Sequence, residues 1–237
     1  PLVIIDVQRG GPSTGLPTKS EQTDLLQALY GRNGESPMPV IAATSPTDCF
    51  DAAFMACKIA VEHMTPVILL SDAYIANGSA AWHLPNLNDY PAIVPPYVKP
   101  EMAGSWTPFQ RNPQTGVRYW ATPGMKGFMH RIGGLEKSNE TGAISTEPEN
   151  HNLMTRLRAE KVERIAASIP DLEVEGDADA DLLIVGFGGT YGHLHSAMDA
   201  MNRHGKKAAL AHFKFINPLP RNTEAVLRHY KKIVVAE

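Results

Sequence analysis

Residues able to bind an anion follow the first apolar run of the chain. Val3-Ile4-Ile5 is short, β-branched and uninterrupted, which predicts a buried strand. Before the next helical pattern come a guanidinium, paired glycines, hydroxyls and an ammonium group: Arg9, Gly10, Gly11, Ser13, Thr14, Thr18 and Lys19. Strand-to-helix loops of α/β sheets commonly hold anionic ligands at the carboxyl edge of the sheet. The sequence therefore favours a carboxylate or phosphate ligand here.

Arg9 is the main candidate ligand-binding residue in this loop. A guanidinium offers a rigid fork that matches a carboxylate with two parallel hydrogen bonds. Gly10 and Gly11 lack the Cβ atoms that would keep a ligand away from the backbone. The alternative is a structural arginine that fixes the loop by pairing with an acid such as Asp72. Both interpretations fit the residues alone.

The glycine-rich stretch Gly186–Gly192 is a second candidate site. It lies between an apolar run and a helical pattern, where a dinucleotide-binding fingerprint would lie. However, its third glycine comes one residue late, and no acidic residue ends the next predicted strand at 208–212 to hold a ribose. A tight turn with close helix packing explains the glycines equally well. A nicotinamide-binding module remains an alternative.

Metal ligands and structural cysteines are not indicated. His193 and His195 are two residues apart, so at the start of a helix they point in different directions. Cys49 and Cys57 are eight apart, a spacing that suits neither a CxxC site nor a disulfide framework. We therefore expect no metal site in this chain and a reducing, cytoplasmic location.

Composition narrows the class of partner. The formal net charge is -3 over 237 residues, so no strongly basic surface indicates nucleic acid or anionic lipid. No apolar run approaches the roughly 18 residues that span a bilayer. We expect small-molecule and protein partners, with no nucleic acid and no membrane. The chain has no initiator Met and opens almost inside a strand, which predicts a portion of a longer protein.

Apolar periodicity predicts an α/β fold with two parallel-sheet, three-layer units. Strands are expected at 3–5, 40–43, 66–70, 182–185, 208–212 and 233–235, and helices at 20–30, 50–64, 151–169, 194–203 and 224–229. Alternating strands and helices imply right-handed crossovers and parallel pairing. In the second helix the expected buried face is Phe50, Phe54, Cys57, Val61 and Met64.

The middle of the chain lacks a sustained period from about residue 78 to 148. A loop of that length is uncommon in a compact domain, so the segment is expected to be a linker packed across a surface or a functional excursion. In the following helix, Met154, Leu157, Val162, Ile165 and Ile169 mark the apolar side, and the charges of "RLRAEKVER" predict a solvated face. The expected units are 1–94, a connecting segment with a helix at 95–177, and 178–237.

Three long stretches carry a family resemblance. "VQRGGPSTGLPTKSEQTDLLQALYGRNGE", "TPVILLSDAYIANGS" and "GGTYGHLHSAMDAMNRHGKKAALAHFKFINPLP", in that order, resemble the α subunit of 2-oxoacid:ferredoxin oxidoreductases, closest to the 2-oxoglutarate type. The likeness covers nearly the whole chain and matches the C-terminal portion of that subunit. It implies the second half of a thiamine-diphosphate pyrimidine-binding domain at 1–94 and a transketolase C-terminal-like domain at 178–237.

The resemblance also implies roles for loop residues. Arg9 matches the family arginine that faces the 2-oxoacid carboxylate, in agreement with the interpretation from the residues alone. Thr18 corresponds to a loop position near the distal end of the substrate, and Ser13 and Thr14 line the same turn. No residue of this chain matches the family's glutamate beside the pyrimidine N1′. Glu21 does not align with it, so no catalytic residue is assigned and the residues binding the cofactor remain unknown.

The activity implied by the resemblance is oxidative decarboxylation of a 2-oxoacid to an acyl-CoA with reduction of ferredoxin. The implied cofactors are thiamine diphosphate with Mg²⁺, shared with a β subunit, and an iron–sulfur cluster in the partner subunit, with coenzyme A as co-substrate. The chain lacks a Gly-Asp-Gly diphosphate motif and a cysteine set for a cluster, so we expect it to be inactive alone. The alternatives are a subunit-docking module without catalytic residues, and the nucleotide-binding module above.

Overall fold

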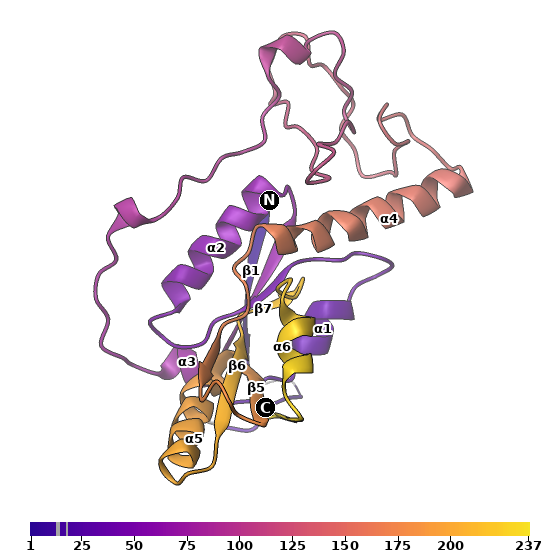
Figure 1. Ribbon diagram of the computed structural model, residues 1–237. Helices are drawn as coiled ribbons and strands as arrows, with labels where there is room; N and C mark the ends of the chain where they lie inside the picture. Colours follow the sequence, from indigo (N-terminus) through magenta and orange to yellow (C-terminus); the bar gives the residue numbers. More distant parts are fainter. Residues whose placement is uncertain (13–14, 18) are drawn as a thin grey trace.

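Two four-stranded sheets form the centre of the molecule (Figure 1). The computed structural model describes residues 1–12, 15–17 and 19–237. The first sheet has the order β1-β3-β2-β7 and the second β4-β6-β5-β8. The strands are β1 (Leu2–Gln8), β2 (Val40–Ala42), β3 (Pro66–Asp72), β4 (Val174–Gly176), β5 (Leu182–Phe187), β6 (Ala208–Phe213), β7 (Phe215–Asn217) and β8 (Lys232–Val235).

Most strand pairs are parallel, as the alternating pattern predicts. β1, β3 and β2 pair in parallel, and so do β6, β5 and β8. The two antiparallel strands, β7 against β2 and β4 against β6, are short strands at sheet edges that the periodicity did not reveal. The prediction of an α/β fold is confirmed.

Six α-helices cover the sheets of the described residues. They are α1 (Leu25–Tyr30), α2 (Cys49–Glu62), α3 (Ala73–Asn77), α4 (Pro148–Arg164), α5 (Tyr191–Arg203) and α6 (Thr223–His229). The expected helix at 20–30 begins only at Leu25, after an N-cap position at Asp24. In Figure 1, α5 and α6 flank the second sheet on opposite sides. None of the helices in the described ranges is both long and apolar enough to cross a lipid bilayer.

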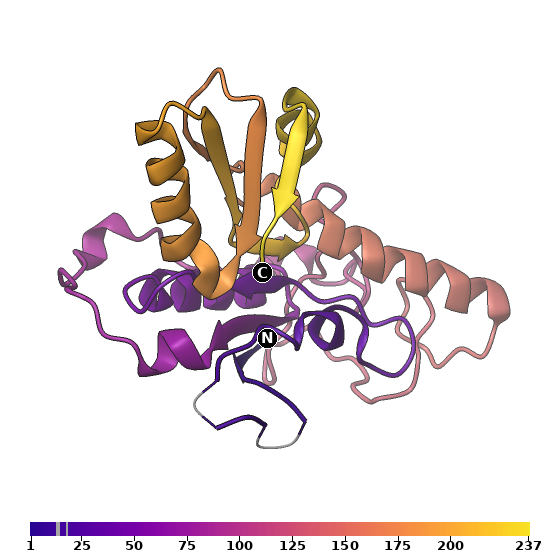
Figure 2. The same cartoon turned by 90° about the horizontal axis from the view of Figure 1, so that it is seen from below.

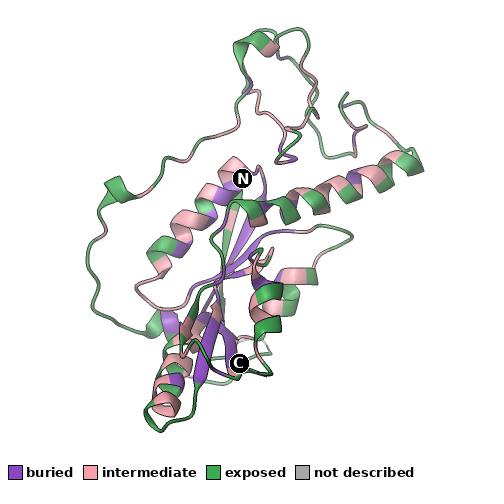
Figure 3. Ribbon diagram, in the orientation of Figure 1, coloured by how far each residue is buried: buried purple, intermediate pink, exposed green. Residues whose placement is uncertain are grey.

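One apolar core joins the two sheets. The largest cluster takes Val40 and Leu70 from the first sheet together with Leu183 and Ala211 from the second, and α1 and α6 pack against it. Figure 3 shows the buried strands of both sheets meeting at the centre. The strand β7 extends this connection, because it follows β6 of the second sheet along the chain but pairs with β2 of the first. The boundaries at 94 and 178 stay predictions.

The burial expected for the first strand is wrong. β1 forms at the predicted place, but the Ile5 side chain is 60% exposed and Leu2, Ile4 and Val7 are also exposed. β1 is the edge strand of its sheet and pairs only with β3. An uninterrupted apolar run indicates a strand covered on both faces. Here Val3 packs against the cluster that α2 forms with the first sheet, while the side chains of Leu2, Ile4, Ile5 and Val7 are left exposed by the described residues.

The buried face of α2 also differs from the prediction. The residues facing the sheet are Ala52, Ala56, Ile59 and Ala60, whose small side chains let the helix approach closely. The predicted aromatic stripe instead faces the following segment. The Phe54 ring lies 4.8 Å from the ring of Tyr90, and the Phe50 ring lies 5.8 Å from that of Trp82. The large residues of the stripe therefore anchor the irregular segment.

The long middle segment is irregular, as predicted. Between Asn77 and Pro148 the described elements are two short 3-10 helices, Leu87–Asp89 and Pro100–Met102, and isolated β-bridges. The apolar side predicted for α4 is confirmed, since Met154 and Val162 are buried, as are Ile165 and Ile169 beyond its end. The solvated face predicted for its charges is wrong at Lys161, whose ammonium donates a hydrogen bond to the Met64 carbonyl at 3.0 Å.

Candidate functional site

The carboxyl ends of β1 and β3 form the edge where Arg9 emerges. Gln8 pairs with Asp72 in the strand register and is almost fully buried. Its amide donates to the Ser71 carbonyl at 3.2 Å and accepts from the Asp24 backbone N–H at 3.1 Å. Gln8 therefore ties together two strands and the start of α1. The next residue, Arg9, is exposed, as expected when successive strand side chains alternate between faces.

The guanidinium of Arg9 forms no hydrogen bond or ion pair with any described residue. The alternative partner considered from the sequence, Asp72, has another role. Its carboxylate accepts a hydrogen bond from the Ile75 backbone N–H at 2.9 Å and caps the N-terminus of α3. Within the described part of the chain, the donors of Arg9 are therefore free for a ligand, and its role in substrate binding stays a prediction.

The described residues that follow Arg9 project from the sheet edge (Figure 2), and backbone hydrogen bonds join them to one another. The Gly10 N–H donates to the Lys19 carbonyl at 3.5 Å, and the Gly15 N–H donates to the Pro12 carbonyl at 3.0 Å. Gly10 is buried at the base of the loop, whereas Lys19 is exposed. The other predicted substrate-binding residues, Ser13, Thr14 and Thr18, lie outside the described residues.

The glycine turn after β5 packs directly against this edge. The Gly189 N–H donates to the side-chain carbonyl of Gln22 at 3.0 Å. A Cβ at Gly188 would lie 2.0 Å from the Oε1 atom of Gln22, and one at Gly189 would lie 2.2 Å from the Oδ2 atom of Asp72. Only glycine permits this approach. Protein groups thus occupy the place where a dinucleotide pyrophosphate would approach the turn, which favours the packing interpretation.

Gln22 also carries an open donor. Its Nε2 atom is buried and has no hydrogen-bond partner among the described residues. A buried donor without an acceptor is costly, so a ligand acceptor at this edge would stabilise it. This donor fits an organic cofactor or substrate that lies against the sheet edge. The described residues offer no comparable site for the metal ion of a diphosphate, because they contain no group of three or more His, Cys, Asp or Glu that could hold a cation.

The histidines of α5 have separate environments, in keeping with their spacing. The Nε2 atom of His195 lies 3.4 Å from a carboxylate oxygen of Glu175, while the His193 ring lies 5.3 Å from that of Tyr74. A third histidine, His212 on β6, escaped the sequence analysis. Burial lowers the pKa of His212 to about 4, and its Nε2 atom lies 3.3 Å from the Thr190 hydroxyl of the glycine turn. His212 is therefore neutral near pH 7.

Sequence reasoning found Arg9 and considered Asp72 as its possible partner, but it missed the roles of Gln8, Gln22 and Asp72 in holding this edge. Gln8, Gln22 and Asp72 are single polar residues in a loop or at strand ends, and no spacing rule distinguishes them from surface residues. The available signal was the position of Gln8 and Asp72 at the ends of two predicted strands, which parallel pairing brings together.

Comparison with known proteins gives a consistent result. Residues 1–150 match the family model described as "Pyruvate flavodoxin/ferredoxin oxidoreductase, thiamine diP-bdg". The "2-oxoglutarate oxidoreductase subunit KorA" of Mycobacterium tuberculosis is 53% identical over 100% of this chain and 36% of its own length. The "2-oxoacid:ferredoxin oxidoreductase 1, subunit alpha" of Aeropyrum pernix is 31% identical over 93% of this chain and 34% of its own length. The chain thus spans about a third of these relatives.

A solved structure is similar over nearly the whole chain. It is the 2-oxoglutarate:ferredoxin oxidoreductase from Magnetococcus marinus with 2-oxoglutarate, coenzyme A and succinyl-CoA bound. The TM-score is 0.87 at 32% sequence identity, and the match covers 98% of this chain and 40% of that one.

Proposed function

Because the chain belongs to the thiamine diphosphate-binding family of pyruvate flavodoxin/ferredoxin oxidoreductases, we propose that it works as part of the α subunit of a 2-oxoglutarate:ferredoxin oxidoreductase. The whole enzyme would decarboxylate 2-oxoglutarate oxidatively, form succinyl-CoA and reduce ferredoxin. The substrate proposal is supported by the name of the 53% identical relative and by the ligands of the similar structure.

The observation that carries the proposal is the guanidinium of Arg9 at the sheet edge, which has no partner among residues 1–12, 15–17 and 19–237. In the proposed role, Arg9 pairs with the carboxylate of the 2-oxoacid and orients its keto carbon. Fixing the substrate in this way lowers the barrier, because the reacting groups are already close together. Ser13, Thr14 and Thr18 of the same loop are proposed to line the substrate site, with Thr18 near the distal end of the substrate.

The cofactors are proposed to be held largely by other parts of the enzyme. Thiamine diphosphate, when bound, supplies the electron sink for decarboxylation. From this chain, the open donor of Gln22 is the group best suited to contact an organic cofactor. Mg²⁺ and an iron–sulfur cluster are assigned to a β subunit. The domain limits of 1–94 and 178–237 are kept as part of this proposal.

An incomplete surface supports a multi-subunit enzyme. The exposed apolar strand β1 has an unpaired edge, and β8 is exposed along its whole length. Exposed apolar strand edges are normally covered in a native assembly. A β subunit and ferredoxin are the proposed protein partners, and the cytoplasm is the proposed location.

The test is the Arg9→Ala substitution in the complete enzyme, assayed as 2-oxoglutarate-dependent reduction of ferredoxin. Loss of a charged hydrogen bond, worth about 2 kcal/mol, should lower kcat/KM roughly 30-fold. Arg203→Ala is the matched control, because Arg203 is an exposed arginine at the end of α5. Equal kinetics for Arg9→Ala and Arg203→Ala would refute the role of Arg9.

A further inference from the structure

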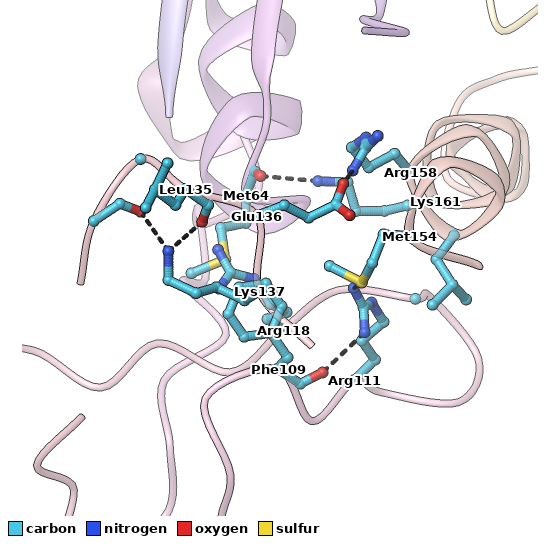
Figure 4. Close-up of a pocket in the computed structure, with 14 residues that line it drawn as sticks. Met64, Phe109, Arg111, Arg118, Leu135, Glu136, Lys137, Met154, Arg158 and Lys161 are labelled. Atoms are coloured by element: carbon cyan, nitrogen blue, oxygen red, sulfur yellow. Dashed lines mark hydrogen bonds and ion pairs between the residues drawn. The ribbon is translucent and has the colours of Figure 1, made fainter. Parts of the chain in front are cut away.

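A cationic cavity lies away from the Arg9 edge (Figure 4). It has a volume of about 400 Å³, within the range of small-molecule sites. It lies between α4, the C-terminal end of α2 and residues 109–137 of the irregular segment. One part of its lining is apolar and includes Phe109, Leu135, Met154 and Leu157. The rest is dominated by basic side chains, so the cavity combines an apolar wall with a strongly positive one.

Four basic residues of the lining form no ion pair with a described residue, although the negative charge of Glu140 acts on the pKa of Arg111. Arg111, Arg118, Lys137 and Lys161 take part in none of the ion pairs among the described residues. The single carboxylate of the lining, Glu136, is already engaged. It accepts from the His151 ring at 2.9 Å and lies 3.8 Å from the Arg158 guanidinium. The cavity therefore holds an excess of positive charge.

The basic groups are only partly satisfied by hydrogen bonds. Lys137 is 4% exposed and donates to the carbonyls of Gly133, at 3.0 Å, and Leu135. Lys161 donates to one carbonyl, that of Met64, although an ammonium has three donors. Arg118 stacks on the Phe109 ring at 4.4 Å and forms no hydrogen bond within the described residues. Donors of Arg118 and Lys161 thus remain free beside the cavity.

Such an arrangement is costly without an anion. Buried cations that lack a counter-charge are strongly destabilising, and a ligand with opposite charge removes that penalty. The lowered pKa of Lys161 shows the same penalty on positive charge. Burial is its main cause, the charges of Arg118 and Arg111 add to it, and the pKa falls to about 8. A ligand with one negative charge would leave most of the excess charge uncompensated. The lining is best suited to a multiply charged group.

We propose that this cavity, here named the α4 cavity, binds the phosphate group of a small phosphate ester. The phosphate accepts hydrogen bonds from the guanidinium of Arg118 and the ammonium of Lys161. The remaining volume takes the organic part of the ester against Phe109, Met154 and Leu157. The site is separate from the Arg9 edge, and it depends on neither the 2-oxoglutarate assignment nor the role of Arg9.

The primary test is calorimetric titration of the complete, assembled protein with sulfate at pH 8. Sulfate is a dianion that does not titrate near this pH, so any proton exchange belongs to the protein. Binding of an anion raises the pKa of Lys161 from about 8, so about half a proton should be taken up per sulfate bound. Titrations in buffers of different ionisation enthalpy measure this uptake. Saturable binding supports the proposal, and proton uptake on binding places the anion beside Lys161. A lack of saturable binding overturns the proposal.

Variants assign the binding to the α4 cavity. Arg118→Gln and Lys161→Gln should each weaken sulfate binding about tenfold or more, the loss expected for one charged hydrogen bond. Lys161→Gln should also abolish the proton uptake. Arg156→Gln is the control, because Arg156 is exposed on α4 and does not line the cavity. Equal affinity in all three variants contradicts the proposal. If a variant does not fold, the saturable sulfate binding of the unmodified protein and its displacement by phosphate compounds still decide the question.

Competition identifies the source of the phosphate. Displacement of sulfate by coenzyme A, with loss of the competition in Arg118→Gln, assigns the cavity to that phosphate ester. Displacement of sulfate by inorganic pyrophosphate but not by coenzyme A assigns the α4 cavity to a different phosphate ester. Sulfate that neither compound displaces would exclude a phosphate site.

Discussion

Replacement of Gly189 by alanine should weaken the contact between the glycine turn and the Arg9 edge. The new Cβ would lie 2.2 Å from the Oδ2 atom of Asp72. Asp72 cannot easily move away, because it is 3% exposed and its carboxylate caps α3 through the Ile75 N–H. Overpacking of this kind costs about 2 kcal/mol, and loss of the cap would add about 1 kcal/mol. For a unit of this size, 2 kcal/mol corresponds to a fall in melting temperature of about 4–8 °C.

Gly192 provides a matched control within the same stretch. A Cβ added at Gly192 has no neighbour within 4 Å, and the residue lies in the first turn of α5. Alanine there should leave the melting temperature unchanged or raise it slightly, since glycine in a helix is less favourable than alanine by up to about 1 kcal/mol. Both variants are measured by thermal denaturation of the purified protein. A Gly189→Ala variant as stable as Gly192→Ala would refute the packing interpretation, and saturable NADH binding would then support the nucleotide-binding alternative.

Three further outcomes test separate parts of the structure. The pKa of His212 is lowered from 6.5 to about 4, so between these pH values the unfolded chain binds a proton that the folded chain does not. The free energy of unfolding should therefore decline as the pH falls from 6.5 towards 4. In thermal melts, His212→Gln should make this decline smaller. Asp48→Ala removes a carboxylate that accepts from both the Lys214 ammonium and the Thr44 N–H, and it should lower the free energy of unfolding by about 1–2 kcal/mol. Glu224→Ala, at an exposed ion pair, should have little effect. Equal melting temperatures for the two variants would show that the Asp48 contacts do not stabilise the fold. Phe54→Ala removes the ring contact with Tyr90 and should speed limited proteolysis within residues 78–95, and an unchanged cleavage rate would show that the stripe does not anchor this segment.

The regular elements could be predicted because their patterns are local. The strands at 66–70, 182–185 and 208–212 are bounded apolar runs, and each forms close to its expected limits. β7 was not predicted, since Phe215–Asn217 is short, is followed by Pro218 and becomes a strand only by pairing with β2. Its pairing depends on contacts between residues far apart in the sequence, and periodicity carries no such information.

Burial was less predictable than secondary structure. The α2 stripe was assigned to the core by its size and spacing, but the sheet required the close approach of alanines and the aromatic residues found other partners. Lys161 was assigned to a solvated face because charge runs usually are solvated, whereas the irregular segment folds over it. Tyr90, which contacts the stripe, and residues 109–137, which lie beside Lys161, belong to a segment without a period to interpret. The Met64 carbonyl that accepts from Lys161 follows α2 and is 97 positions away in the chain.

The candidate site shows the same limit. Arg9 could be selected because its type, the adjacent glycines and the end of a strand coincide within four residues. The residues around it come from β3, the segment before α1 and the glycine turn, which are up to 167 positions apart in the chain. Only the fold brings Gln22 and Asp72 to the same edge.

Chemical rescue of Arg9→Ala by guanidinium tests the central claim most directly. The complete Arg9→Ala enzyme would be assayed for 2-oxoglutarate-dependent ferredoxin reduction with increasing concentrations of methylguanidinium, with methylammonium at equal ionic strength as the control. If the Arg9 guanidinium binds the substrate carboxylate, methylguanidinium should restore part of the lost kcat/KM in a saturable manner and methylammonium should restore less. A loss of activity that neither cation restores, together with an unchanged KM for 2-oxoglutarate, would contradict the assignment of Arg9 as the substrate-binding residue.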